Sequence, residues 1–184
     1  LAGAVLSALF FLALILELFG LLAGQQRQLD LDQAGREAYR ACPVVMAEDL
    51  GLPEGEQRRL REIHSLLVPE YADYFELTRT GEGESRFVDS IRYQCRWEWT
   101  AELLYRLLRW ECEAEGVSAL RRGGTELLDA ELGFDAACAT ADGSYVLLRQ
   151  GDVVALVGCD GMDMTAPERL EMLWERLDLK EETT

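Results

Sequence analysis

The feature that most constrains this chain is the apolar segment with which it begins. Residues 1–24 read LAGAVLSALFFLALILELFGLLAG, and every position except Ser7 and Glu17 is apolar or small. A helix rises about 1.5 Å per residue, so roughly 20 apolar residues span the hydrocarbon core of a bilayer. The sequence therefore predicts a transmembrane helix over residues 1–24, with the rest of the chain on one side of the membrane.

Two other interpretations of this segment fit less well. A signal peptide has a basic region before an apolar core of about 7–15 residues, whereas no Lys or Arg precedes this longer run. A buried core helix that is apolar on all faces needs a large surrounding protein. The chain begins with Leu1 rather than Met, so we expect that further residues precede it in a longer protein.

Three residues in the segment are candidates for contacts within the membrane. Glu17 is its one charged residue, and an ionisable group in a bilayer either faces a partner or reaches toward the interface. Gly20 and Gly24 have the small-xxx-small spacing that lets a second helix approach closely. Helix–helix self-association and contact with a protein partner are both compatible with this pattern.

The remainder of the chain has the composition of an acidic folded domain. The whole chain carries 18 Lys and Arg against 34 Asp and Glu, a net charge of −16, and 49% of its residues are apolar. Nucleic acids and anionic lipid surfaces bind clustered Lys and Arg, so this charge argues against both partners. We expect a transmembrane helix at 1–24, a juxtamembrane linker at 25–40, a soluble α+β domain at 41–179 and a polar tail at 180–184.

The first part of the soluble domain favours strands. The run VVM after Pro43 suits a short buried strand. Residues 65–80 and 87–97 alternate in polarity around a GEGES turn, which predicts a β-hairpin, with room for a bulge at Asp89. Residues 56–64 fit either a helix or an extended segment.

The clearest helix of the soluble part covers residues 98–114. Its apolar positions recur at helical spacing, and Gly116 is a candidate for the C-cap. Glu102 and Arg106 are spaced to form an i,i+4 ion pair on the polar side. The residues expected to pack on a sheet are Ala101, Leu104, Leu107, Leu108, Trp110 and Cys112.

The last third predicts a β-meander followed by a helix. Residues 133–158 form three short apolar runs, with turn signals at Asp142-Gly143 and Gln150-Gly151, and the third run has the composition of a central strand. Thr165 and Glu168 have the spacing of a capping box that opens a helix. This helix is expected to bury Leu170, Leu173, Trp174 and Leu177.

These elements define an α+β fold. It consists of an N-terminal transmembrane helix followed by an antiparallel sheet packed with two main helices, at about residues 98–115 and 165–178.

The succession of segments also resembles a known group of proteins. The stretches VVMAEDLGLPEG, LLVPEYADYFEL and SYVLLRQGDVVALVGCDGMDMTAPERL, with an aromatic strand running into a long helix between the last two, are similar to uncharacterised membrane-anchored proteins of Gram-positive bacteria. The C-terminal meander and helix also resemble the PsbP/Mog1-like α-β-α sandwich. This resemblance implies an architecture and a location outside the cytoplasm, and it brings no activity.

The sequence carries no catalytic motif. His64 is the one histidine, so a hydrolase that depends on it is the remaining enzymatic alternative to a plain surface or core histidine. Among the five cysteines no pair has CxxC spacing, which argues against zinc ribbons and thioredoxin-like sites. Two disulfides with one free thiol are an alternative to buried reduced thiols, which the apolar surroundings of Cys95, Cys112 and Cys138 favour.

No cofactor or metal is expected either. Asp152, Asp160 and Asp163 are close in sequence, but their spacing is not that of a calcium-binding loop. The glycines form neither a dinucleotide-binding fingerprint nor a phosphate-binding loop.

An aromatic group where the hairpin runs into the long helix is the best candidate for a ligand or partner surface. Tyr93, Trp97 and Trp99, with Trp110 further along, either line a groove or pack in the core at this junction.

Two functional classes follow from these features. One is a membrane-tethered extracytoplasmic binding or interaction domain, and the other is a sensory or regulatory tail coupled to a longer protein through the transmembrane helix. Only Arg27, Arg36 and Arg40 follow the segment closely. Because basic flanks stay in the cytoplasm, this weakly basic flank favours an extracytoplasmic domain, in agreement with the resemblance.

Overall fold

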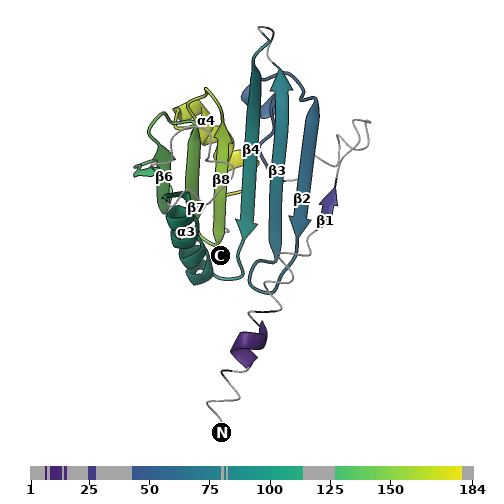
Figure 1. Ribbon diagram of the computed structural model, residues 1–184. Helices are drawn as coiled ribbons and strands as arrows, with labels where there is room; N and C mark the ends of the chain where they lie inside the picture. Colours follow the sequence, from purple (N-terminus) through teal and green to yellow (C-terminus); the bar gives the residue numbers. More distant parts are fainter. Residues whose placement is uncertain are drawn as a thin grey trace.

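Eight antiparallel strands form one sheet in the order β1-β2-β3-β4-β8-β7-β6-β5 (Figure 1). The computed structural model describes residues 7, 9–13, 15, 25–27, 43–79, 81, 83–113 and 127–179. The α+β class and the antiparallel sheet predicted from the sequence are therefore confirmed. The strands are β1 (Gln25–Arg27), β2 (Gln57–Ile63), β3 (Glu70–Arg79), β4 (Ser85–Gln94), β5 (Leu127–Asp129), β6 (Ala136–Thr140), β7 (Tyr145–Gln150) and β8 (Val153–Cys159).

Strands β3 and β4 form the predicted hairpin. Their ladder runs without interruption from the Glu70 and Gln94 pair to the Arg79 and Ser85 pair. Asp89 pairs in register with Phe75, so the bulge considered at Asp89 is absent. The undecided segment 56–64 is extended and supplies β2.

The prediction of a strand after Pro43 is wrong, but the predicted burial of its apolar residues is confirmed. Val44 and Val45 are fully buried, but the segment is irregular and continues into a short 3-10 helix, η1 (Glu48–Leu50). Its peptide groups bond to side chains of the sheet instead of a neighbouring strand. The Val45 N–H donates to Ser90 Oγ at 2.9 Å, and the Ala47 N–H donates to Glu76 Oε2 at 2.9 Å.

The long helix, α3 (Glu98–Glu113), lies where the sequence placed it. The ion pair between Glu102 and Arg106 is present. The predicted burial of Leu107 and Trp110 is wrong, because their side chains are 53% and 67% exposed. The helix contacts the sheet along one narrow face only, and the proposed C-cap at Gly116 lies outside the described residues.

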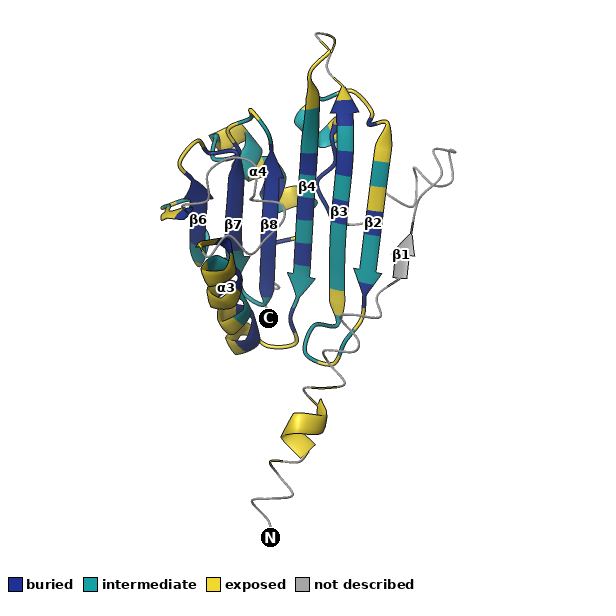
Figure 2. Cartoon of the chain, in the orientation of Figure 1, coloured by how far each residue is buried: buried dark blue, intermediate teal, exposed yellow. Residues whose placement is uncertain are grey.

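The predicted meander is confirmed as β6, β7 and β8. All seven residues of β8 are buried between β4 and β7, as expected for a central strand (Figure 2). The turn before β8 is Gly151-Asp152 rather than Gln150-Gly151, because Gln150 pairs with Val153. Residues 141–144 connect β6 to β7, and there Gly143 adopts a left-handed φ of 72°.

The last helix, α4 (Pro167–Arg176), begins without the predicted capping box. Ala166 occupies the N-cap position, and the Thr165 hydroxyl donates instead to Asp163 Oδ1 at 2.6 Å. The predicted inner face is otherwise correct, since Leu173 and Leu177 are fully buried and Leu170 and Trp174 pack against the same core.

Each face of the sheet has its own core. On one face, α3 covers the half of the sheet formed by β6, β7 and β8, packing on side chains that include Cys138, Leu147 and Leu156. On the other face, α4 and the segment after Pro43 pack on side chains of β4, β7 and β8. The sheet is thus a layer between two helices, and each helix has an outer side that meets solvent.

Gly158 of the central strand pairs with Tyr145 of β7 and lies against its ring. A Cβ at this position would overlap with the Cδ1 and Cε1 atoms of Tyr145, whose ring is 1% exposed and has no room to move. We expect Gly158→Ala to lower the free energy of unfolding by about 2–3 kcal/mol, measured by urea denaturation of the full chain in detergent. Gly81→Ala is the control, because a Cβ there meets nothing within 4 Å; an equal effect of both substitutions would contradict this packing.

Few residues of the apolar N-terminal segment are described. Residues 7, 9–13 and 15 are helical, and residues 9–12 carry side chains that are more than half exposed. Among the described residues, no helix has the length and apolar character needed to cross a membrane. The other positions of the predicted transmembrane helix, including Glu17, Gly20 and Gly24, lie outside the described residues, as do the tail at 180–184 and most of the predicted linker.

Candidate interaction surface

The outer side of α3 carries a line of large apolar side chains, here named the apolar stripe. It consists of Trp99, Leu103, Leu107 and Trp110, which are 61%, 52%, 53% and 67% exposed. At about 100° of rotation per residue, these four positions fall within an arc of about 80°. The stripe is therefore continuous along one side of the helix.

The helix is apolar on two opposite sides. Ala101, Tyr105, Leu108 and Cys112 face the sheet and are buried, on the side away from the stripe. Ion pairs occupy the margin between the two sides, because Arg106 bonds to Glu102, and Arg109 bonds to Glu113 at 3.0 Å. A second apolar side is not needed to hold α3 on its sheet, so the stripe is available to something outside the described domain.

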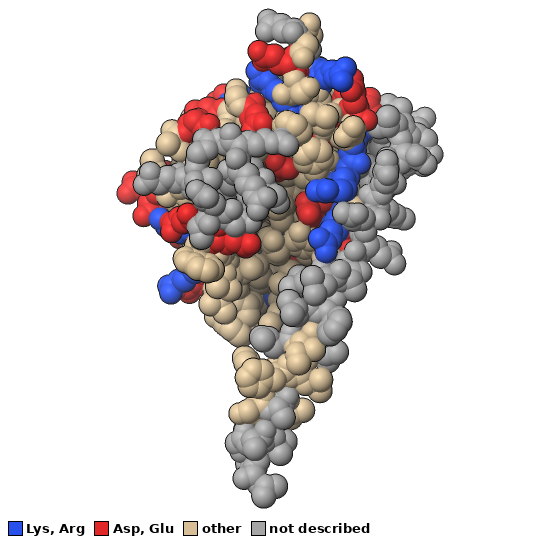
Figure 3. All heavy atoms as spheres, in the orientation of Figure 1, with Lys and Arg blue, Asp and Glu red and all other residues tan. Residues whose placement is uncertain are grey.

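Next to the start of the stripe lies a smaller exposed group, here named the corner, which consists of Leu66 and Trp97. Their side chains are 58% and 45% exposed. The ring of Trp97 stacks on that of Trp99 with centroids 5.8 Å apart, and the Arg96 guanidinium lies 5.9 Å from the Trp97 ring. Figure 3 shows a mostly uncharged surface at the lower end of α3 and the adjoining end of the sheet, with charged side chains above it.

The three predicted surface residues separate into two places. Trp97 and Trp99 come together and are exposed, whereas Tyr93 lies half-buried on the sheet, with its ring 4.8 Å from that of Tyr71. Burial and the neighbouring Tyr71 raise the pKa of Tyr93, as expected for a phenol that stays neutral. Trp110, the fourth member of the predicted aromatic group, is also exposed, and the structure adds Leu66, Leu103 and Leu107 to the surface.

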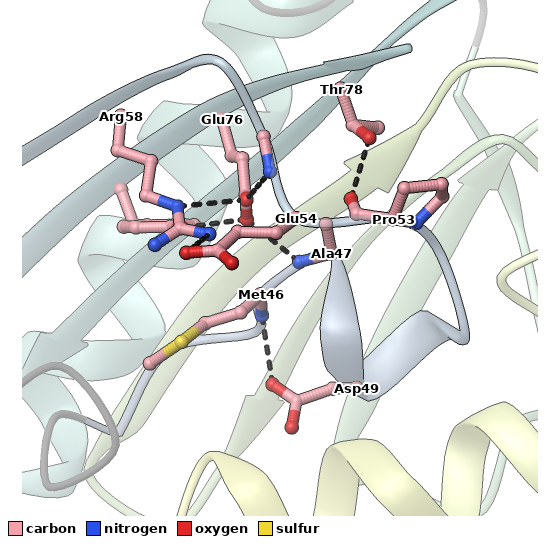
Figure 4. A network of polar contacts seen from close by, with 10 residues as sticks. Met46, Ala47, Asp49, Pro53, Glu54, Arg58, Glu76 and Thr78 are labelled. Atoms are coloured by element: carbon pink, nitrogen blue, oxygen red, sulfur yellow. Dashed lines mark hydrogen bonds and ion pairs between the residues drawn. The ribbon is translucent and has the colours of Figure 1, made fainter. Parts of the chain in front are cut away.

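The most elaborate polar cluster is centred on Glu76, which is 1% exposed (Figure 4). Its Oε1 accepts from the Gly55 N–H at 2.7 Å and from Arg58 Nε at 3.0 Å. Its Oε2 accepts from the Ala47 N–H at 2.9 Å and from the Tyr74 hydroxyl at 2.6 Å. Because both oxygens are occupied and no face is open to a substrate, this cluster fastens the segment before β2 to the sheet.

The remaining candidates for catalysis or metal binding, His64 and the aspartates near the C-terminus, do not come together in one site. His64 is exposed, and its Nδ1 lies 2.7 Å from the Pro69 carbonyl oxygen. Asp163 Oδ1 accepts hydrogen bonds from the Thr165 hydroxyl and from the Thr165 N–H, and these two donors keep the pKa of that carboxyl below its usual value. In the part of the chain that the structure describes, no three His, Cys, Asp or Glu side chains are placed to hold a metal ion.

Four of the five cysteines are described, and all four are buried and free: Cys95, Cys112, Cys138 and Cys159. The interpretation as buried reduced thiols is confirmed for these four, while Cys42 lies outside the described residues. Burial raises the pKa of Cys95 and of Cys159 to about 11, and that of Cys112 to about 12.

These pKa values predict slow thiol chemistry. The thiolate is the reactive form, so at pH 8 we expect the four buried thiols to react with a disulfide reagent such as DTNB at least about a hundredfold more slowly than free cysteine. The measurement compares the reaction rates of the Cys42→Ser chain when it is folded in detergent and when it is unfolded in guanidinium. Rapid reaction of these thiols in the native protein would show that the cores around them are open.

Comparison of the chain with protein family models, with curated proteins and with solved structures finds no match. The resemblance to membrane-anchored proteins of Gram-positive bacteria therefore stays a prediction.

Proposed function

We propose that this chain is a membrane-tethered, extracytoplasmic interaction domain that pairs with a second copy of itself through the apolar stripe. The observation that carries the proposal is the exposure of Trp99, Leu103, Leu107 and Trp110, each between 52% and 67%, along one line of α3. The tether is the apolar segment at residues 1–24, whose length and composition are those of a membrane span.

The size of the stripe favours a partner that is also held at the membrane. Its exposed side chains amount to roughly 500 Å² per copy, or about 1,000 Å² in a pair, which is the lower end of specific interfaces. A contact of this size is weak between molecules free in solution. Tethering both partners to one bilayer raises their effective concentration and removes much of the orientational cost.

The same membrane also fixes how two copies would meet. Ile63, Tyr71 and Tyr93 lie side by side across β2, β3 and β4, so β2 and β4 end at the same end of the sheet. Gln25 pairs with Glu62 at this end, and α3 begins there after β4. Two copies that rise from one bilayer therefore have their α3 helices parallel, related by a twofold axis along the membrane normal.

The margins of the stripe suit this parallel arrangement. Arg106 lies on one side of the stripe, and Glu111 lies on the other side, five residues further along. In a parallel pair of helices, positions with this offset face each other across the two chains. Each Arg106 would meet a Glu111 of the second copy, and opposite charges there favour the parallel register.

The proposal is tested with the full chain in phosphatidylcholine vesicles. Alkaline carbonate extraction comes first, because recovery of intact chain in the soluble fraction would contradict the tether. Donor and acceptor dyes are then attached to a Glu171→Cys, Cys42→Ser chain, since Glu171 is exposed on α4. We expect energy transfer well above that of randomly distributed labels at low surface density; transfer at the random level would contradict pairing.

The side of the membrane is tested in intact cells with the same variant. An impermeant maleimide is expected to label Glu171→Cys without lysis. Full protection of this position until the cells are lysed would place the domain in the cytoplasm.

A further inference from the structure

We infer that the end of the sheet which carries the corner rests in the headgroup region of the bilayer, with Leu66 and Trp97 inserted at the interface. The domain would then lie at a fixed distance from the bilayer surface, in direct contact with the headgroups, rather than at a variable distance set by a flexible linker. This inference rests on the proposed tether and goes beyond it, because a tether alone leaves the height and the tilt of the domain above the bilayer open.

The register of β1 carries the first step. Gln25 directly follows the apolar segment, and it already pairs with Glu62, one residue before the end of β2. No spacer therefore separates the segment from the sheet. If residues 1–24 span the bilayer, this end of the sheet lies within a few ångströms of the headgroups.

The corner lies at this same end of the sheet. Leu66 belongs to the connection between β2 and β3, and Trp97 belongs to the connection between β4 and α3. Arg96 holds the two connections together, because its N–H donates to the Leu67 carbonyl at 3.0 Å and its Nε donates to the Leu66 carbonyl at 2.9 Å. The Cys95 N–H donates to the Asp152 carbonyl at 2.8 Å, which adds the turn before β8 to the same surface.

The chemistry of this surface suits a lipid interface. Tryptophan is enriched at the level of the headgroups, where its ring is apolar and its N–H still finds acceptors. Leu66 adds an apolar side chain that is 58% exposed, and Arg96 places a guanidinium beside Trp97 that is suited to a phosphate. The net charge of −16 opposes anionic lipids, so the lipid surface that fits is zwitterionic.

The four tryptophans of the chain make the inference measurable. The full chain is reconstituted in phosphatidylcholine vesicles with brominated acyl chains, which quench nearby indoles. Trp110 is the matched control, because 13 residues of helix separate it from Trp97 along an axis that rises about 1.5 Å per residue, roughly 20 Å in all. Trp97→Phe and Trp110→Phe remove one indole each from otherwise identical chains.

We expect bromination to quench the wild-type chain, Trp97→Phe to lose at least half of the quenched intensity, and Trp110→Phe to keep all of it. Leu66→Glu should reduce the quenched fraction about twofold while the chain still floats with the vesicles. Equal quenching of the Trp97→Phe and wild-type chains that float would overturn the inference and leave the tether intact. Failure of the wild-type chain to float would overturn the tether and the inference together.

Discussion

Replacing Glu76 with alanine is expected to destabilise the domain by about 3–5 kcal/mol, the largest effect of any single substitution considered for its fold. The substitution leaves the Ala47 and Gly55 N–H groups, the Tyr74 hydroxyl and the Arg58 guanidinium without their shared acceptor. All of these donors are buried or partly buried, so water replaces the carboxylate poorly. The segment before β2, which covers one face of the sheet, is then held mainly by its apolar side chains.

Urea denaturation of the full chain in detergent measures this effect. Tyr74→Phe is the matched control, because it removes one donor to Glu76 Oε2 and leaves the carboxylate and its other partners in place. We expect Tyr74→Phe to cost about 1 kcal/mol. If Glu76→Ala were no more destabilising than Tyr74→Phe, the network would not be what fastens this segment.

A Leu107→Glu substitution is expected to weaken pairing of the tethered domains on the order of a thousandfold. Burying the exposed part of one leucine contributes about 2 kcal/mol at roughly 25 cal/mol per Å², and a twofold interface loses this contribution twice. The new carboxylates would also face each other across the axis. Because Leu107 is 53% exposed in the single domain, the fold itself should lose little stability.

Leu128→Glu is the matched control for this experiment. Leu128 is also a leucine at 48% exposure, but it belongs to β5 and lies outside the stripe. Energy transfer between labelled copies in vesicles should fall to the random level for Leu107→Glu and stay unchanged for Leu128→Glu. An unchanged signal for Leu107→Glu would remove the stripe from the proposed interface.

The sequence predicted those elements whose signals are local. The hairpin of β3 and β4, the meander from β6 to β8 and both helices follow from alternation, turn residues and helical spacing, and each is confirmed. Gly143 and Gly151 show why, since each adopts the left-handed φ that its turn requires. The segment after Pro43 was predicted as a strand because its burial was visible and its hydrogen-bond partners, Ser90 and Glu76, were not.

Only part of the proposed interaction surface could be predicted from the sequence, because the outward direction of an apolar side chain on a helix is not visible without its neighbours. The aromatic pattern indicates Trp97 and Trp99 as surface candidates. Helical spacing assigns Leu107 to the core and leaves Trp110 either in a groove or in the core. The missed signal was the spacing of Trp99, Leu103, Leu107 and Trp110, which repeats at intervals of four, four and three residues on the side opposite Ala101 and Tyr105. A helix with two apolar sides has one more than its own sheet requires.

Pairing through the stripe is tested most directly by disulfide formation between copies in vesicles. Leu103→Cys and Trp110→Cys are made in the Cys42→Ser chain, where the other thiols are buried. In a parallel pair each of these positions faces its own counterpart, so both variants should form disulfide-linked dimers on mild oxidation, and Glu171→Cys on α4 should not. Dimer formation at positions 103 and 110 no faster than at position 171 would contradict the proposed pairing.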